Sequence, residues 1–194
     1  MKKINLLVLI FLLGSCAQIE EVPISSLISK DGLTYSPNTQ IPFTGVATSF
    51  YYNGRIEKKI SFKDGLAQGA YEEYYNNRTS QLSQRGMKSI DGAWSDGVYE
   101  AWHENGELEF KARFTKGQIV DGVYTSYHMN GAIWGVETYK NGQLNGPFQI
   151  FDDKGHMVSE GTRKNGEWHG TIRVYNRNGD VEKEQIYVEG RLEK

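Results

Sequence analysis

The sequence has little proline, little cysteine and no excess of charge of either sign. Four prolines among 194 residues exclude a collagen-like or proline-rich chain. The single cysteine, Cys16, excludes a disulfide within the chain. The formal net charge of −2, with acidic and basic residues interspersed, provides no basic patch of the kind that binds nucleic acid. We therefore predict no nucleic-acid partner.

Long hydrophobic runs are also absent, apart from one short run near the N-terminus. The apolar stretch from Leu6 to Leu13 follows Lys2 and Lys3, and it is far shorter than the ~20 residues that a membrane-spanning helix requires. Basic residues before a short apolar run and small residues after it are typical of a secretory signal. We assign residues 1–15 to such a signal. A short buried hydrophobic segment is the alternative interpretation.

Cys16 lies directly after this signal. The stretch Leu13 to Cys16, "LGSC", resembles the lipobox of bacterial lipoproteins, whose cysteine becomes the acylated first residue after cleavage. The resemblance implies a lipid anchor at Cys16, and Ala17 in place of aspartate implies the outer membrane without indicating which side. Residues 16–26 are then a tether. A plain signal with a chance cysteine is the alternative.

Glycine and aromatic residues are abundant in the rest of the chain. Glycine accounts for 22 of the 194 residues, above the ~7% of an average protein. Twelve tyrosines, eight phenylalanines and four tryptophans favour a pleated sheet, on which aromatic side chains pack well. An apolar content of 38% is enough for a folded domain.

Glycine and aromatic residues recur in a repeat. Six glycines are 24, 28, 25, 24 and 24 residues apart, namely Gly45, Gly69, Gly97, Gly122, Gly146 and Gly170. An aromatic residue follows each of them by five positions, namely Phe50, Tyr74, Trp102, Tyr127, Phe151 and Tyr175. A second glycine follows by nine positions in five of the six units. A fixed period of this length indicates a repeat architecture.

Each unit is predicted to be a hairpin, with a strand, a turn, a second strand and a second turn. Asn-Gly and Asp-Gly pairs lie at both turns, and such pairs favour a two-residue turn with positive φ at both residues. Over residues 45–194 this predicts an all-β, elongated antiparallel meander of about twelve short strands. Residues 27–44, which include Asp31-Gly32 and Pro37, are predicted to form an N-terminal cap hairpin and loop.

The second strand of each unit alternates between apolar and polar residues. In "ELEFKARF", one face of the strand is predicted to carry Leu108, Phe110, Ala112 and Phe114. The other face is predicted to carry Glu109, Lys111 and Arg113. The first strand carries aromatics two and five positions after the glycine, as in Tyr99 and Trp102. This odd separation leaves two alternatives open. Either the strand is apolar on both faces, or a bulge redirects one ring.

The pattern of glycine, aromatic, aromatic, Asn-Gly, aliphatic residue and Asx-Gly resembles the MORN repeat in its bacterial variant form. The resemblance extends from Pro42 to Lys194 in six near-register copies. It implies an elongated antiparallel sheet and a non-enzymatic interaction or scaffold role, with binding of a protein or an envelope component. Some bacterial members of the group are labelled antitoxins, so a toxin-neutralising or immunity role is the alternative.

The second unit departs from the pattern. The stretch Tyr74 to Gly97 carries extra residues and has Asn76-Asn77 where an Asn-Gly pair is expected. Drift of an exposed loop is one explanation. The other is a contact site, because binding residues concentrate on loops held by a rigid scaffold. On this second interpretation the candidate partner-contact residues are Asn76, Asn77, Arg78, Met87 and Trp94.

No motif in the sequence points to catalysis, a metal or a cofactor. His103 and His128 occupy equivalent positions in consecutive units, but such positions lie two strands apart, about 9 to 10 Å, which is too far to share a zinc ion without a third ligand. No serine occupies a nucleophile elbow. We predict a protein that is not an enzyme and needs no cofactor, anchored to the bacterial cell envelope.

Overall fold

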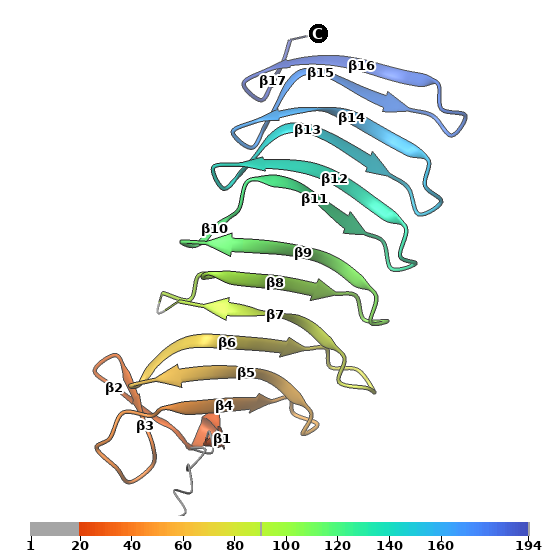
Figure 1. Cartoon of the computed structure of the whole chain (residues 1–194). Helices are drawn as coiled ribbons and strands as arrows, with labels where there is room; N and C mark the ends of the chain where they lie inside the picture. Colours follow the sequence, from red (N-terminus) through yellow and green to blue (C-terminus); the bar gives the residue numbers. More distant parts are fainter. Residues whose placement is uncertain (1–19, 90, 194) are drawn as a thin grey trace, which may run out of the picture.

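The structure is a computed structural model that describes residues 20–89 and 91–193. Its strands lie side by side in sequence order and form one long sheet (Figure 1). The antiparallel meander consists of β4 (Gly45–Phe50), β5 (Ile56–Lys63), β6 (Leu66–Tyr74), β7 (Leu82–Lys88), β8 (Gly97–Trp102), β9 (Leu108–Thr115), β11 (Gly122–Tyr127), β12 (Ile133–Lys140), β13 (Gln143–Phe151), β14 (Met157–Lys164), β15 (Glu167–Tyr175) and β16 (Val181–Val188). The predicted all-β meander is confirmed.

Two further short strands pair with this sheet. β10 (Gln118–Ile119) pairs with β9 before the chain continues into β11. β17 (Arg191–Leu192) pairs with the end of β16 and is the last strand of the described chain. The first turns of the units lie along one side of the sheet and the second turns along the other (Figure 1). Equivalent residues of successive units are therefore neighbours.

The end of the sheet at β4 is covered by residues that precede the repeats. β1 (Glu21–Pro23) pairs in parallel with β4, and a 3-10 helix, η1 (Ile24–Ser26), follows it directly. The Glu21 carboxylate forms an ion pair with Lys59 Nζ at 2.8 Å. The assignment of residues 16–26 to a tether is therefore corrected from Glu21 onward, because these residues form part of the fold.

A hairpin covers the same end of the sheet. β2 (Ile28–Lys30) and β3 (Leu33–Tyr35) form a separate two-stranded sheet around the turn at Asp31 and Gly32. The loop that follows brings Phe43 into a small core with Ala47 and Phe62, in which Phe43 and Ala47 are almost fully buried. Burying apolar side chains here stabilises the first repeat, which has no earlier repeat to pack against.

In every unit except the second, the second turn is the two-residue turn that the sequence predicts. In the first unit Asp64 and Gly65 have φ of 51° and 81°. Both residues are also at positive φ in the equivalent turns Lys116-Gly117, Asn141-Gly142, Asn165-Gly166 and Glu189-Gly190. This backbone matches the twist of the strands that the turn connects.

The first turn differs from the prediction in the five units that have a glycine there, because only the glycine has positive φ. In the first unit Gly54 has φ of 80°, and its N–H donates to the Tyr51 carbonyl at 2.9 Å. Asn53 is not in the left-handed region; its Oδ1 instead accepts from the Arg55 N–H at 3.1 Å. This is a longer turn in which glycine supplies the left-handed residue and asparagine holds the loop through its side chain.

A β-bulge occurs at the same place in every unit, and it decides between the two alternatives for the aromatic residues. In the third unit Ala101 pairs with Phe110, and Trp102 pairs with Leu108, so Glu109 has no partner. Paired residues share a face of the sheet, so Leu108 joins Trp102 on the face opposite Phe110. The prediction that Leu108 shares the face of Phe110 is therefore wrong, and Glu109 lies on that face instead.

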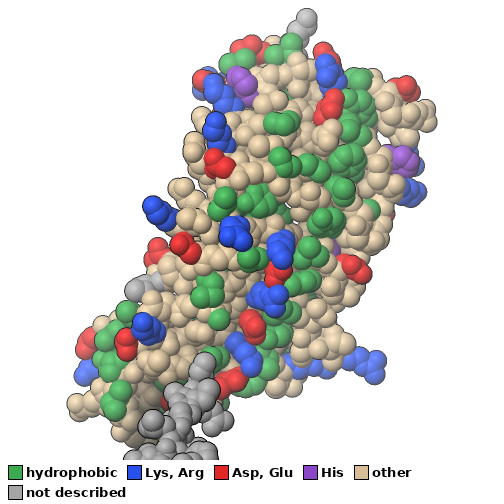
Figure 2. All heavy atoms as spheres, in the orientation of Figure 1, with side chains coloured by type: hydrophobic (Ala, Val, Ile, Leu, Met, Phe, Trp, Pro, Cys, Tyr) green, Lys and Arg blue, Asp and Glu red, His purple; other side chains and the backbone are tan. Residues whose placement is uncertain are grey.

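The two faces of the sheet differ in chemistry. On one face, here called the aromatic face, successive ring centroids are 4.5 to 6.4 Å apart along the series Tyr71, Trp94, Tyr99, Phe110, Tyr124 and Tyr139. The series resumes with Phe148, Trp168 and Tyr187. The other face, the polar face, carries ion pairs such as Arg85 and Lys111 with Glu100. Figure 2 shows that hydrophobic side chains extend along the length of the visible surface, interrupted by charged ones.

Backbone pairing is thinnest where the third unit meets the fourth. β9 and β11 share only the pair Ser126 and Phe110, whereas β11 and β12 pair along their whole length. The chain between them makes β10 and then the bend at Asp121 instead of one continuous strand. This junction positions the site described next.

Candidate ligand-binding groove

Small side chains leave a hollow on the aromatic face between the third and fourth units. Four residues after the repeat glycine, these units have Ala101 and Ser126, where the units on either side have Glu73 and Ile150. Gly135, which pairs with Ser126 across β11 and β12, adds no side chain. The result is a groove of about 550 Å³ that crosses β8, β9, β11 and β12. It lies over the junction where backbone pairing is thinnest.

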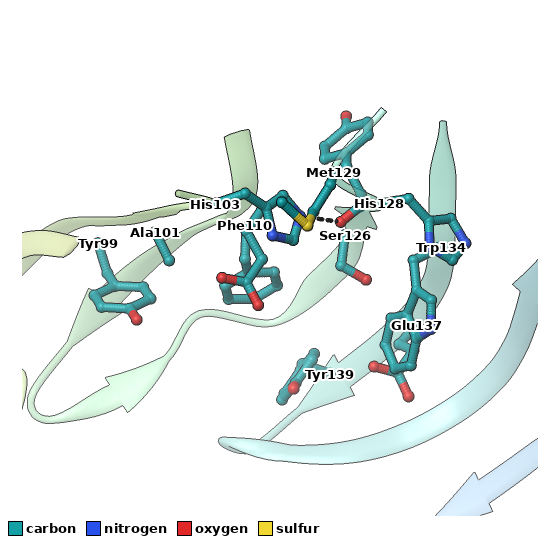
Figure 3. A pocket seen from close by; sticks show the side chains of 12 residues that line it. Tyr99, Ala101, His103, Phe110, Ser126, His128, Met129, Trp134, Glu137 and Tyr139 are labelled. Atoms are coloured by element: carbon teal, nitrogen blue, oxygen red, sulfur yellow. Dashed lines mark hydrogen bonds between the residues drawn. The ribbon is translucent and has the colours of Figure 1, made fainter. Parts of the chain in front are cut away.

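Aromatic rings form the walls of this groove. Figure 3 shows Tyr99 and Phe110 on one side, and Trp134 and Tyr139 of β12 on the other. Trp134 is 44% exposed, because it is the bulge residue of β12 and has no partner on the adjacent strand. The groove therefore offers accessible ring surfaces to a ligand.

Two carboxylates, Glu109 and Glu137, lie among these rings. Glu109 is the bulge residue of β9, and Glu137 lies on β12 between Tyr124 and Phe148 of the flanking strands. Within residues 20–89 and 91–193, neither carboxylate forms a hydrogen bond or an ion pair. The groove therefore holds two carboxylates that no lysine or arginine contacts directly within the described part of the chain.

Burial affects the ionisation of the groove residues. Loss of water around Glu137 raises the pKa of its carboxyl above the ordinary value, and the Arg163 guanidinium opposes this rise in part. Burial likewise raises the pKa of the Tyr99 and Tyr139 hydroxyls above the ordinary value. A carboxylate in such surroundings gains from any cation that approaches it, because little water screens the pair.

Histidines at the rim of the groove are engaged by the next repeat. His103 Nε2 lies 2.8 Å from the Tyr127 carbonyl, and His128 Nε2 lies 3.0 Å from the Phe151 carbonyl. A carbonyl only accepts, so each Nε2 carries the hydrogen. Among the described residues no group of three or more His, Cys, Asp or Glu side chains could hold a metal ion.

Two cations of the protein lie on aromatic rings of the same face, one on each side of the groove. Lys88 Nζ is 3.7 Å from the centroid of the Trp94 ring. Arg163 Cζ is 4.3 Å from the centroid of the Trp168 ring. Both are cation–π contacts. No lysine or arginine is among the residues that line the groove between them.

The structure places three of the predicted contact residues in the first turn of the second unit. Asn76 Oδ1 accepts from Asn53 Nδ2 at 2.6 Å, and Asn77 Nδ2 donates to the Glu104 carbonyl at 3.4 Å. The two asparagines thus connect their turn to the turns on both sides. Arg78 is exposed, and Ser80, with φ of 50°, supplies the left-handed residue that glycine supplies in the other units.

The other two predicted contact residues, Met87 and Trp94, lie near the opposite end of β7. Trp94 stacks against Tyr71 and Tyr99, and a side chain at Gly86 would have its Cβ 2.8 Å from the Trp94 ring. Trp94 is thus a packing residue of the aromatic face, whereas Met87 is 40% exposed. The five predicted residues do not come together in one site.

Cys16, the predicted lipidation site, lies outside the described residues, as does the whole segment 1–15. The helices in the described part of the chain include none that is long and apolar enough to cross a membrane. Acylation of Cys16 therefore stays a prediction.

The groove itself was not found from the sequence. The signal that could have revealed it is the occurrence of small residues, Ala101 and Ser126, in two consecutive units at a position where the second, fifth and sixth units have larger side chains. Recognising it also requires the bulge, because Glu109 and Trp134 reach the aromatic face only as bulge residues. The regular alternation of a strand would place both on the opposite face.

Comparison with known proteins supports the repeat. Three segments, residues 43–64, 95–116 and 120–141, match the family described as MORN repeat variant. No curated protein matches the chain significantly. A crystal structure of a protein of unknown function from Bacteroides fragilis is 10% identical and covers 76% of this chain and 95% of its own, with a TM-score of 0.15. The repeat matches indicate a repeat-based binding or scaffold protein.

Proposed function

We propose that the protein is a non-enzymatic interaction protein of the bacterial cell envelope. It is anchored by lipid at Cys16 and binds a protein or envelope component through its repeat sheet. The observation that carries the proposal is the groove on the aromatic face. There Trp134 and the neighbouring rings are accessible, on a scaffold in which each repeat is hydrogen-bonded to the next. Rigid scaffolds with accessible aromatic residues are suited to recognition.

The chemistry of the groove favours binding over catalysis. His103 and His128 donate Nε2–H to backbone carbonyls, so this side of each ring holds neighbouring repeats together and does not face a substrate. Ser126 Oγ, the hydroxyl at the floor, lies 3.5 Å from the Gly135 carbonyl. A hydroxyl without a neighbouring base is a weak nucleophile.

The lipid anchor is tested by metabolic labelling with palmitate. We expect the wild-type chain to incorporate label and to fractionate with the outer membrane. Cys16→Ser should lose both properties. Ser25→Ala, a change of an exposed residue outside the "LGSC" stretch, is the control. Labelling that persists in the Cys16→Ser chain would contradict the anchor.

Binding through the groove is tested by site-specific photo-crosslinking in cells. A photoreactive amino acid is placed at Trp134 on the aromatic face or at Lys111 on the polar face. We expect a discrete crosslinked species from position 134 and none from position 111. Equal crosslinking from both positions, or none from either, would contradict the proposal.

The alternative role, neutralisation of a toxin, stays a prediction. The groove fits an interaction with a toxin no better than with any other envelope protein. A toxin gene that regularly neighbours the gene for this chain, together with loss of protection when the chain is removed, would favour the alternative over a general scaffold role.

A further inference from the structure

We propose that the groove binds the cationic side chain of an arginine or lysine on a partner protein, held between the rings of Tyr99, Phe110 and Trp134 and the carboxylates of Glu109 and Glu137. This inference rests on the proposed function and specifies the chemistry of the partner. It assigns one site to one kind of occupant.

The first argument comes from the protein's own cations. On the aromatic face, Lys88 lies on Trp94 in the second unit, and Arg163 lies on Trp168 in the fifth. Lys88, Arg163, Phe114 and Tyr139 occupy equivalent positions, each paired across the strands with the glycine that starts its unit. The third and fourth units thus carry aromatic rings where the flanking units carry cations.

The second argument is charge complementarity. Glu109 and Glu137 face the groove without an ion pair among the described residues, whereas Glu100 on the polar face pairs with both Arg85 and Lys111. The Glu137 carboxylate is half-buried, which is costly to the fold, and an incoming cation removes part of that cost. Ring faces attract the same cation through their quadrupole.

The third argument concerns the size of the occupant. The groove has a volume of about 550 Å³ and spans four strands, so it has room for a long side chain together with the adjoining backbone. Arginine and lysine have apolar stems that cover ring surfaces while the charged end reaches a carboxylate. A segment of a partner protein therefore fits the groove better than a small free amine.

The experiment uses the full-length chain, labelled with fluorotryptophan and observed by fluorine NMR. Replacing Trp134 by Phe assigns its signal. The probes are the peptide acetyl-Ala-Arg-Ala-Arg-Ala-amide, the same peptide with citrulline in place of arginine, and spermidine. Citrulline keeps the shape of arginine but carries no charge.

We expect the arginine peptide to shift the Trp134 signal in a saturable way. Citrulline in the peptide should weaken binding at least tenfold, and so should Glu109→Gln or Glu137→Gln. Glu182→Gln is the matched control, because Glu182 is the bulge residue of the sixth unit, as Glu109 is in the third. This variant should bind as the wild type does.

Three results would overturn the proposal. The first is the absence of binding by the arginine peptide. The second is equal binding of the citrulline peptide, or equal weakening by Glu182→Gln. The third is tighter binding of spermidine than of the peptide, which would identify a free polyamine as the occupant.

The failure of this inference and that of the proposed function can be told apart. If position 134 crosslinks to a partner in cells but citrulline makes no difference, the cation site is wrong and the interaction role stands. If the arginine peptide binds but position 134 crosslinks to nothing, the site is real and the interaction role is wrong.

Discussion

The side chain at one position of the repeat forms a hydrogen bond to the next repeat. Six residues after the repeat glycine, Tyr51, Tyr75, His103 and His128 each reach the carbonyl of the aromatic residue in the following unit, at 2.7 to 3.0 Å. A hydrogen bond of this kind contributes about 1 kcal/mol. The series ends at Asp152, which cannot donate when ionised. Its carboxylate instead accepts from His156, which lowers its pKa to about 2.

Glu137 provides a residue-scale prediction, because its pKa is raised by burial. Between the ordinary pKa and the raised one, the folded protein keeps a proton that the unfolded chain has lost. Stability contributed by this group therefore falls as pH rises through that interval. Glu137→Gln removes the buried charge, so we expect the variant to be more stable than the wild type at pH 7.5. The difference should shrink toward pH 4.5.

This prediction is checked by thermal unfolding of both chains across that pH range. The charged and titratable groups near Glu137 are Arg163, Glu109, Tyr124 and Tyr139, and they are unchanged in the variant. Glu182→Gln is the control, since Glu182 is exposed. A stability difference that does not vary with pH would rule out ionisation of Glu137 as its cause. The same variant is expected to lose cation binding, so stability and binding should change in opposite directions.

The two kinds of turn provide a prediction at the scale of elements. Lys116 lies in a second turn with φ of 50°, a conformation that costs a lysine roughly 1 kcal/mol. Lys154 lies in a first turn and has no positive φ. Lys116→Gly should therefore be neutral or stabilise the protein by a few tenths of a kcal/mol. Lys154→Gly should destabilise it by ~0.5–1 kcal/mol, because glycine loses more backbone entropy.

The measurement is chemical denaturation of the two variants beside the wild type. Both changes remove one positive charge from an exposed lysine, so charge effects are matched. Destabilisation of similar size in both variants would contradict the assignment of the two turn types.

The strands and their order could be predicted from the sequence, whereas the bulge could not. Asn-Gly pairs and alternating residues such as Phe110, Ala112 and Phe114 specify where strands turn and which face is apolar. The bulge depends on which residue of a strand lacks a cross-strand partner, and pairing is a property of two segments. Glu109 and Trp134 therefore reach the aromatic face, where alternation alone does not place them.

The site was missed for the same reason. Irregularity of the second unit in the sequence suggested a contact surface, but Asn76 and Asn77 continue the hydrogen bonds of the regular units, and Trp94 continues the aromatic face. The groove arises where the sequence is regular and the side chains are small. Volume left between neighbouring repeats is a property of packing, which a one-dimensional pattern does not contain.

At the scale of the whole molecule, the two ends of the sheet are protected in different ways. β17 covers only Tyr187 and Val188 of β16, and the rest of that strand carries Glu182, Lys183 and Glu184. Charged side chains at an edge discourage pairing with another molecule. β4, "GVATSF", has no charged residue, and β1 pairs with it from Glu21 to Pro23. We therefore expect that β4 needs β1 beside it to prevent pairing with another molecule, and that β16 does not need β17.

Deleting one cover or the other tests this asymmetry. Removal of residues 20–26 takes away β1 and η1, which exposes the edge of β4 and the core around Phe43. We expect a less stable chain that self-associates through β4, detected as dimers and larger species by sedimentation at increasing concentration. Removal of residues 189–194 exposes the β16 edge, yet its charges should keep that chain monomeric. Equal self-association of the two truncated chains would show that charge does not protect β16, and a monomeric chain lacking residues 20–26 would show that β1 is not a protective cover.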